Sequence, residues 1–118
     1  MFAKLSAAVA MLMLATALAA AGAPEGRYRV VGSNPGGGGK YSGTVSVERT
    51  GQTYRVTWQI GRQTFYGTGI GSEKGLAVSY RSTDFTGLAI YGPEGDDWDG
   101  VWTVTDGRTI GAERWTRE

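Results

Sequence analysis

Strict alternation of apolar and polar side chains is the feature of this sequence that most restricts its fold. In the segment 54–60 every second residue, from Tyr54 to Ile60, is large and apolar, and the residues between them are polar. Side chains in a β-strand point alternately to two faces, so this pattern predicts a strand with one face buried. The segments 41–48, 76–81 and 98–105 alternate in the same way. After residue 21 no segment has the apolar spacing of an amphipathic helix, so the sequence predicts an all-β fold.

Weaker apolar segments complete a set of eight candidate strands. They lie at 28–31, 64–70, 85–91 and 109–116. Glycine-containing turns, such as those at Gly51 and Gly107, separate neighbouring candidates. Short turns favour an antiparallel meander, in which each strand pairs with the next one along the chain.

An aromatic residue stands two positions before a glycine on four of these segments, at residues 41, 65, 85 and 98. Residues two apart in a strand share a face, so each copy places a large ring beside a gap, and the glycine permits the strand to bend. Repeated bending is what closing a sheet requires. We therefore expect an eight-stranded antiparallel meander β-barrel, with a β-sandwich as the alternative.

The first 21 residues differ from the rest of the chain. Lys4 gives the start a positive charge, Leu5 to Ala21 is almost entirely apolar, and small residues stand at 19–21. This layout is typical of a signal peptide cleaved after Ala21, and a retained membrane anchor is the alternative. The sequence thus predicts a signal peptide at 1–21 and a single β-barrel domain at 22–118, in a secreted or periplasmic protein that does not bind a membrane once the signal is removed.

The charge balance gives no reason to expect a nucleic-acid partner. Removing residues 1–21 takes away Lys4 and reduces the 12 basic residues to 11, which equals the 11 acidic residues. A neutral chain has no electrostatic attraction for nucleic acid or for an anionic membrane surface.

Composition also argues against catalysis. The chain has no His and no Cys, which removes histidine-based acid–base chemistry and most zinc and copper sites. An acidic cluster at Glu94, Asp96, Asp97 and Asp99 has oxygen ligands of the kind calcium uses, but it lacks the calcium-loop pattern and predicts a solvated loop. We expect a non-enzymatic protein with no metal and no cofactor.

Aromatic residues are the clearest indication of a binding site, because a small barrel needs only a few large side chains to fill it. The surplus is expected to line a pocket or to form an exposed patch. A lined pocket indicates a small apolar or aromatic ligand, whereas a patch around Tyr66, Trp98 or Trp115 indicates a protein partner. The candidate binding residues are Trp58, Trp98, Trp102, Tyr54, Tyr66, Tyr80 and Trp115.

A series of short motifs runs along the same chain. Examples are Tyr-x-Val-x-Gly-x-Asn-Pro at 28–35, Tyr-x-Val-x-Trp-x-Ile-Gly at 54–61 and Gly-Leu-Ala-Ile-Tyr at 87–91. Through these motifs the chain resembles a family of small exported bacterial proteins that are often labelled fibronectin-binding protein. The resemblance implies adhesion to an extracellular or periplasmic protein and supplies no binding residues. Inhibition of an exported enzyme is a further alternative, and the oligomeric state is left open. The spacing of the predicted strands and of the Trp residues is also similar to that of avidin and calycin barrels, which is a likeness of architecture alone.

Overall fold

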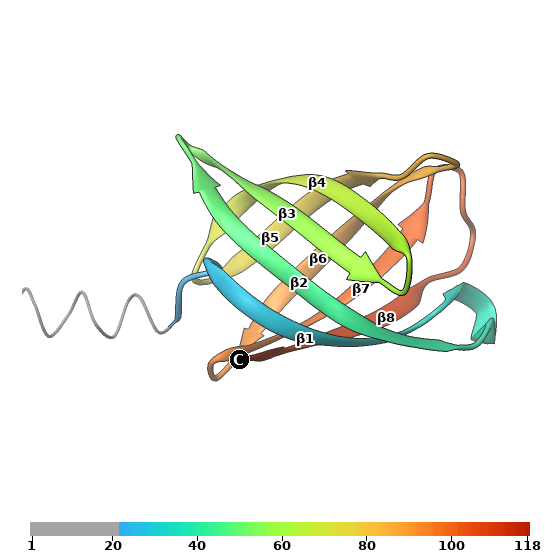
Figure 1. Cartoon of the computed structure of the whole chain (residues 1–118), viewed down its shortest axis with the longest axis horizontal. Helices are drawn as coiled ribbons and strands as arrows, with labels where there is room; N and C mark the ends of the chain where they lie inside the picture. The colour runs from blue at the N-terminus through green and yellow to red at the C-terminus, as the bar shows by residue number, and fades with distance from the viewer. Residues whose placement is uncertain (1–21) are drawn as a thin grey trace, which may run out of the picture.

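Eight antiparallel strands follow one another around a closed barrel in the order of the chain (Figure 1). The computed structural model describes residues 22–118, so the predicted signal peptide at 1–21 lies outside the described residues and stays a prediction. The strands are β1 (Gly26–Ser33), β2 (Lys40–Thr50), β3 (Thr53–Ile60), β4 (Gln63–Ser72), β5 (Gly75–Arg81), β6 (Thr86–Glu94), β7 (Asp97–Val104) and β8 (Gly111–Arg117), with one 3₁₀ turn, η1 (Pro35–Gly37), between β1 and β2.

The predicted eight-stranded meander barrel is confirmed. Strand β1 pairs with β2 on one side and with β8 on the other, so the sheet closes and has no free edge. The β-sandwich alternative is wrong for that reason, because a sandwich keeps two separate sheets with edges. Over the described part of the chain, no helix has the length and apolar character needed to cross a membrane.

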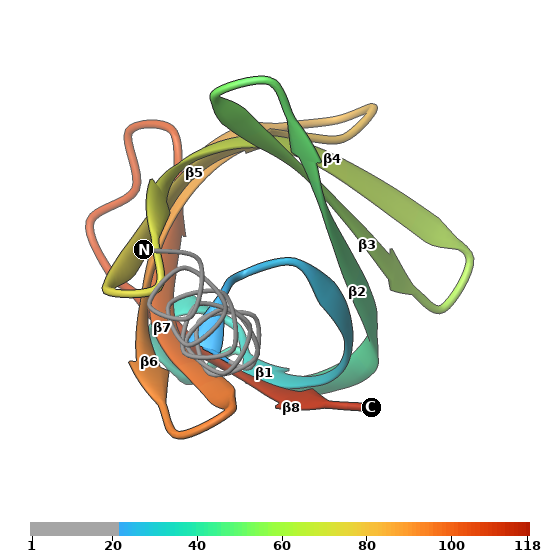
Figure 2. The ribbon, with the colours of Figure 1, turned by 90° about the vertical axis from the view of Figure 1, so that its left-hand side faces the viewer.

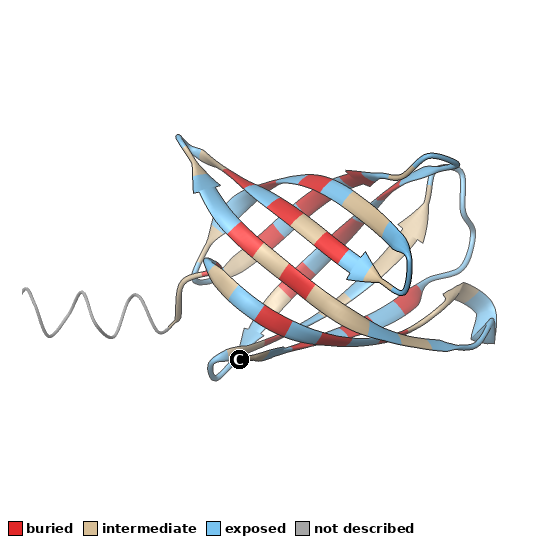
Figure 3. Ribbon diagram, viewed as in Figure 1, coloured by how far each residue is buried: buried red, intermediate tan, exposed pale blue. Residues whose placement is uncertain are grey.

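Burial alternates along the strands as the sequence pattern predicts (Figure 3). In β3 and β5 the large apolar residues face the interior and are buried, while the residues between them face outward. The eight inward faces together form one continuous core.

The two ends of the barrel differ. At the first end, which we call the closed end, residues 22–25 lie against the start of β1 (Figure 2). The Tyr28 hydroxyl donates to the Pro24 carbonyl at 2.6 Å, and Arg117 Nη2 donates to the Ala23 carbonyl and to Tyr28 Oη, each at 2.7 Å. Pro24, Tyr28, Trp98 and Trp115 are all fully buried, so this end is filled. The second end, which we call the open end, carries η1 and the turns β3–β4, β5–β6 and β7–β8.

Four inward-facing rings each lie over a glycine of the neighbouring strand. The paired residues are Tyr41 and Gly32, Tyr80 and Gly87, Tyr91 and Gly100, and Trp102 and Gly111. A Cβ added at any of these glycines would overlap the paired ring, so the glycine makes the space in which the ring lies along the barrel wall. From the sequence, each ring was paired with the glycine two positions later on its own strand. The structure shows that the ring covering each glycine comes from the adjacent strand.

Several strand boundaries differ from the segments expected from the sequence, and two of the differences change a connection. The candidate strand 85–91 is extended at its end, because β6 continues to Glu94 and only Gly95 and Asp96 form the turn before β7, with Gly95 at a φ of 64° that favours glycine. Strand β8 begins at Gly111, so Thr109 and Ile110 belong to the preceding connection.

Candidate functional site

The interior of the barrel is hollow toward the open end. A cavity of about 230 Å³ lies there, beyond the filled half of the core. A cavity of about 150 Å³ is sufficient to hold benzene, so this one has room for a molecule with one ring and a short substituent. Its lining is Asn34, Tyr41, Trp58, Ile60, Gln63, Phe65, Tyr80, Phe85, Ala89, Tyr91, Trp102 and Glu113.

Aromatic rings form most of the wall, and several of them meet edge to face. The Tyr80 ring lies 6.0 Å from the Trp58 ring and 6.2 Å from the Trp102 ring, with interplanar angles of 63° and 76°. Tyr41 meets Trp102 in the same manner, with a centroid distance of 6.1 Å. Edge-to-face packing is a favoured arrangement for aromatic pairs, so these rings support one another around the cavity.

One carboxylate lies at the inner wall of this aromatic cavity. Glu113 of β8 faces the interior and is only 9% exposed. Its Oε1 accepts hydrogen bonds from Trp58 Nε1 at 3.0 Å, Tyr91 Oη at 2.8 Å and Trp115 Nε1 at 2.7 Å. Its Oε2 accepts a hydrogen bond from Tyr41 Oη at 2.5 Å. All four partners donate, so the carboxyl group acts only as an acceptor, which is the role of its ionised form.

The tyrosines around Glu113 are held in their protonated form. Burial, followed by the nearby charge of Glu113, raises the pKa of Tyr41 and of Tyr91 well above 10. The same two causes raise the pKa of Tyr80 to about 12. A low-dielectric site and a neighbouring negative charge both disfavour a phenolate, so these hydroxyls stay hydrogen-bond donors at neutral pH.

The structure brings three of the seven predicted binding residues together at the cavity: Trp58, Tyr80 and Trp102. Tyr54, Trp98 and Trp115 are buried in the core and are not part of the lining, although Trp115 bonds to Glu113. Tyr66 faces outward from β4 and is 50% exposed.

The predicted exposed aromatic patch around Trp98 or Trp115 is wrong. These residues are 1% and 0% exposed, because both occupy inward positions and stand opposite each other in the β7–β8 pairing. Their rings fill the core toward the closed end and leave no Trp surface there for a partner.

Sequence reasoning missed the residue that organises the site. Glu113 shares the inward face of its strand with Trp115, and a charged residue at an inward-facing position was the available signal. Tyr41 and Tyr91 were also missed, because they reach Glu113 only through the register of strands distant in sequence.

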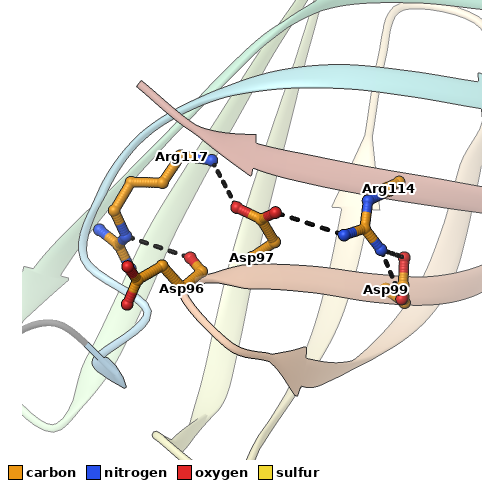
Figure 4. Close-up of polar contacts among 5 residues, drawn as sticks. All are labelled: Asp96, Asp97, Asp99, Arg114 and Arg117. Carbon is orange, nitrogen blue, oxygen red and sulfur yellow. Dashed lines mark hydrogen bonds and ion pairs between the residues drawn. The ribbon is translucent and has the colours of Figure 1, made fainter.

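The acidic residues at the β6–β7 turn lie outside the barrel and bind arginines (Figure 4). Arg114 Nη1 donates to both carboxylate oxygens of Asp99 at 2.8 Å, and its Nη2 donates to Asp97 Oδ2 at 3.3 Å. The Arg117 backbone N–H donates to Asp97 Oδ1 at 3.0 Å. The carboxylate oxygens of Asp97 and Asp99 are therefore already engaged by arginine or backbone donors, and within residues 22–118 no three acidic side chains lie together in a way that could hold a metal ion.

A line of apolar residues crosses the outer surface. Five outward-facing positions in direct register on β4 to β8 are apolar, and we call them the outer apolar row: Ile70, Ala77, Ile90, Val101 and Ala112. Ile70 and Ile90 are 62% and 58% exposed, and Leu88 adds a further exposed side chain on β6.

Comparisons with known proteins do not assign the chain. No protein-family model matches it. No curated protein matches it either. The cavity and the outer apolar row are therefore the two features from which a function can be argued.

Proposed function

We propose that the protein binds one small, largely apolar molecule inside the open end of the barrel, without catalysing a reaction. The observation that carries this proposal is the aromatic-lined cavity of about 230 Å³. An eight-stranded barrel is wide enough either to be filled by side chains or to hold one small ligand. Here the closed half is filled and the open half is hollow.

The chemistry of the lining supports binding over catalysis. Among the described residues that surround the cavity, Glu113 is the one carboxylate, and its neighbours are aromatic, aliphatic or amide side chains. Its oxygens already accept hydrogen bonds from four side chains. A mostly apolar pocket with a few polar groups is the usual form of a small-molecule site.

Filling the cavity tests the proposal. Ala89 is buried and lines the cavity, whereas Ala77 faces outward on the neighbouring strand β5. Ala89→Leu should remove binding of benzyl alcohol and indole, and Ala77→Leu should retain it, as measured by Trp fluorescence and calorimetry. Circular dichroism confirms that both variants are folded. Failure of the native protein to bind either probe, or unchanged binding by Ala89→Leu, would refute a ligand cavity.

Export is part of the proposal. The apolar run that ends in small residues before Gly22 supports removal of residues 1–21 and a secreted or periplasmic location. Mass spectrometry of the protein recovered from outside the cytoplasm should find a chain that begins at Gly22. An intact chain that remains with the membrane fraction would contradict export by this route.

A second candidate function is adhesion to a protein, for which the outer apolar row is the favourable observation. Exposed apolar groups in contiguous positions mark interaction surfaces more often than scattered ones do. The resemblance to proteins labelled fibronectin-binding points to the same class of partner. Binding to immobilised fibronectin that is lost on Ile90→Ser and Val101→Ser would support this function, and equal binding by native protein and double variant would refute it.

A further inference from the structure

The cavity contains one formal charge, and it is negative. Glu113 is the only carboxylate among the described residues of the lining, and no Lys or Arg is among them. The ion pairs within residues 22–118 join Arg27 to Glu118 and Arg114 to Asp97 and Asp99, and none includes Glu113. Hydrogen bonds therefore compensate the buried carboxylate without a protein cation. A ligand that carries a positive charge would gain a strong attraction there, because the buried Glu113 carboxylate is screened little by water.

The two oxygens of Glu113 are used unequally. Oε1 accepts from three donors, whereas Oε2 accepts from the Tyr41 hydroxyl alone. An ionised carboxylate offers roughly four acceptor positions, two on each oxygen. Oε2 thus retains an acceptor position on the group that lines the cavity, and an N–H donor would fill it.

The aromatic wall suits the same kind of ligand. The faces of Trp and Tyr rings carry partial negative charge and attract cations, most strongly where water is excluded. Trp58, Tyr80 and Trp102 all line the cavity, and Phe65 and Ile60 add apolar surface for the uncharged part of a ligand.

From these three features we infer that the ligand is a protonated primary or secondary amine on a small aromatic or aliphatic body, whose ammonium group donates to Glu113 Oε2. This inference rests on the proposed ligand-binding function and specifies its chemistry. A carboxylate ligand would place two negative charges side by side. A neutral alcohol would fill the acceptor position of Oε2 and leave the charge of Glu113 uncompensated. A quaternary ammonium would supply charge without an N–H donor.

Calorimetry with four probes of similar size separates these possibilities. Benzylamine, benzyl alcohol, benzoate and benzyltrimethylammonium are titrated into the native protein at neutral pH. The same titrations are made with Glu113→Gln, which keeps the side-chain shape and removes the charge, and with Glu48→Gln. Glu48 is exposed on the outside of β2, so the latter variant removes an equal charge away from the cavity.

We expect benzylamine to bind the native protein and Glu48→Gln at least tenfold more tightly than benzyl alcohol does, about 1.4 kcal/mol, and more tightly than benzyltrimethylammonium. Benzoate should bind least. In Glu113→Gln the preference for the amine over the alcohol should disappear.

Each other outcome decides against the inference. Equal affinity of benzylamine and benzyl alcohol for the native protein would rule out a preference for a cationic ligand and leave the proposed ligand-binding function intact. This comparison uses the native protein alone, so it does not depend on whether a variant folds. A preference for the amine that persists in Glu113→Gln overturns the role of Glu113. Binding of none of the four probes overturns the inference, and if benzyl alcohol and indole also fail in the fluorescence test, the proposed function fails with it.

Discussion

Truncation of Glu113 should destabilise the barrel far more than loss of any carboxylate on its outer surface. In Glu113→Ala the indole N–H groups of Trp58 and Trp115 and the Tyr91 hydroxyl lose a buried acceptor, and Tyr41 loses a partly buried one. A buried donor without a partner costs about 1–3 kcal/mol, so the three buried donors together cost roughly 3–9 kcal/mol. Water entering from the open cavity relieves part of this cost. We therefore expect a net loss near the lower limit, about 3 kcal/mol.

Urea denaturation followed by Trp fluorescence measures this loss. A domain of this size unfolds with a slope of roughly 1.5 kcal/mol per molar urea, so a loss of 3 kcal/mol lowers the midpoint by about 2 M. Glu48→Ala is the matched control, and its effect should stay within about 0.5 kcal/mol because Glu48 is exposed. Glu113→Gln should fall between them, since its carbonyl oxygen can still accept. If Glu113→Ala changed the midpoint no more than Glu48→Ala does, the carboxylate would not organise the core.

Three further predictions follow from the same structure. Gly100→Ala should lower the free energy of unfolding by about 1–3 kcal/mol, because its Cβ would overlap the Tyr91 ring. Gly92→Ala on the adjacent strand should have little effect, because no atom lies close to its added Cβ. Equal effects of the two substitutions in urea denaturation would contradict the pairing of rings with glycines. The free energy of unfolding should fall as pH rises from 10 toward 12, because Tyr80 ionises near pH 10 in the unfolded chain and near pH 12 in the folded protein. Below pH 10 Tyr80 is protonated in both states, so its full contribution to stability is present there. Alkaline denaturation that began well below pH 10 would contradict the raised pKa of Tyr80. Millimolar calcium should leave Tm unchanged, since Arg114 already occupies Asp97 and Asp99, and a clear increase in Tm would show a calcium site.

The strands could be predicted because their signal is local. Alternation in 54–60 and 76–81 requires only neighbouring residues, and the structure reproduces both segments as β3 and β5. Glycines in the turns and in the strands supplied the bends from which closure was inferred. Strand ends were less predictable, because pairing with a neighbour extends β6 through Pro93, opposite Trp98 of β7.

The site could be predicted only in part, because it depends on register. Glu113 meets Tyr41 across 72 positions of sequence and Tyr91 across 22, and no local pattern states that β2, β6 and β8 bring these groups to one point. For the same reason the sequence could not distinguish the roles of Trp98 and Trp102, which lie four positions apart on β7. Trp98 fills the core while Trp102 lines the cavity, because the filled and hollow halves of the barrel divide along the strand.

A crystal structure of the protein with benzylamine would show directly whether the open end is hollow and whether Glu113 binds the polar group of a ligand there. We expect density for the ring among Trp58, Tyr80 and Trp102, with the amine nitrogen about 3 Å from Glu113 Oε2. A barrel whose open end is filled by its own Phe65, Phe85 and Trp102 side chains, with the Glu113 carboxylate out of reach of the ligand, would contradict it.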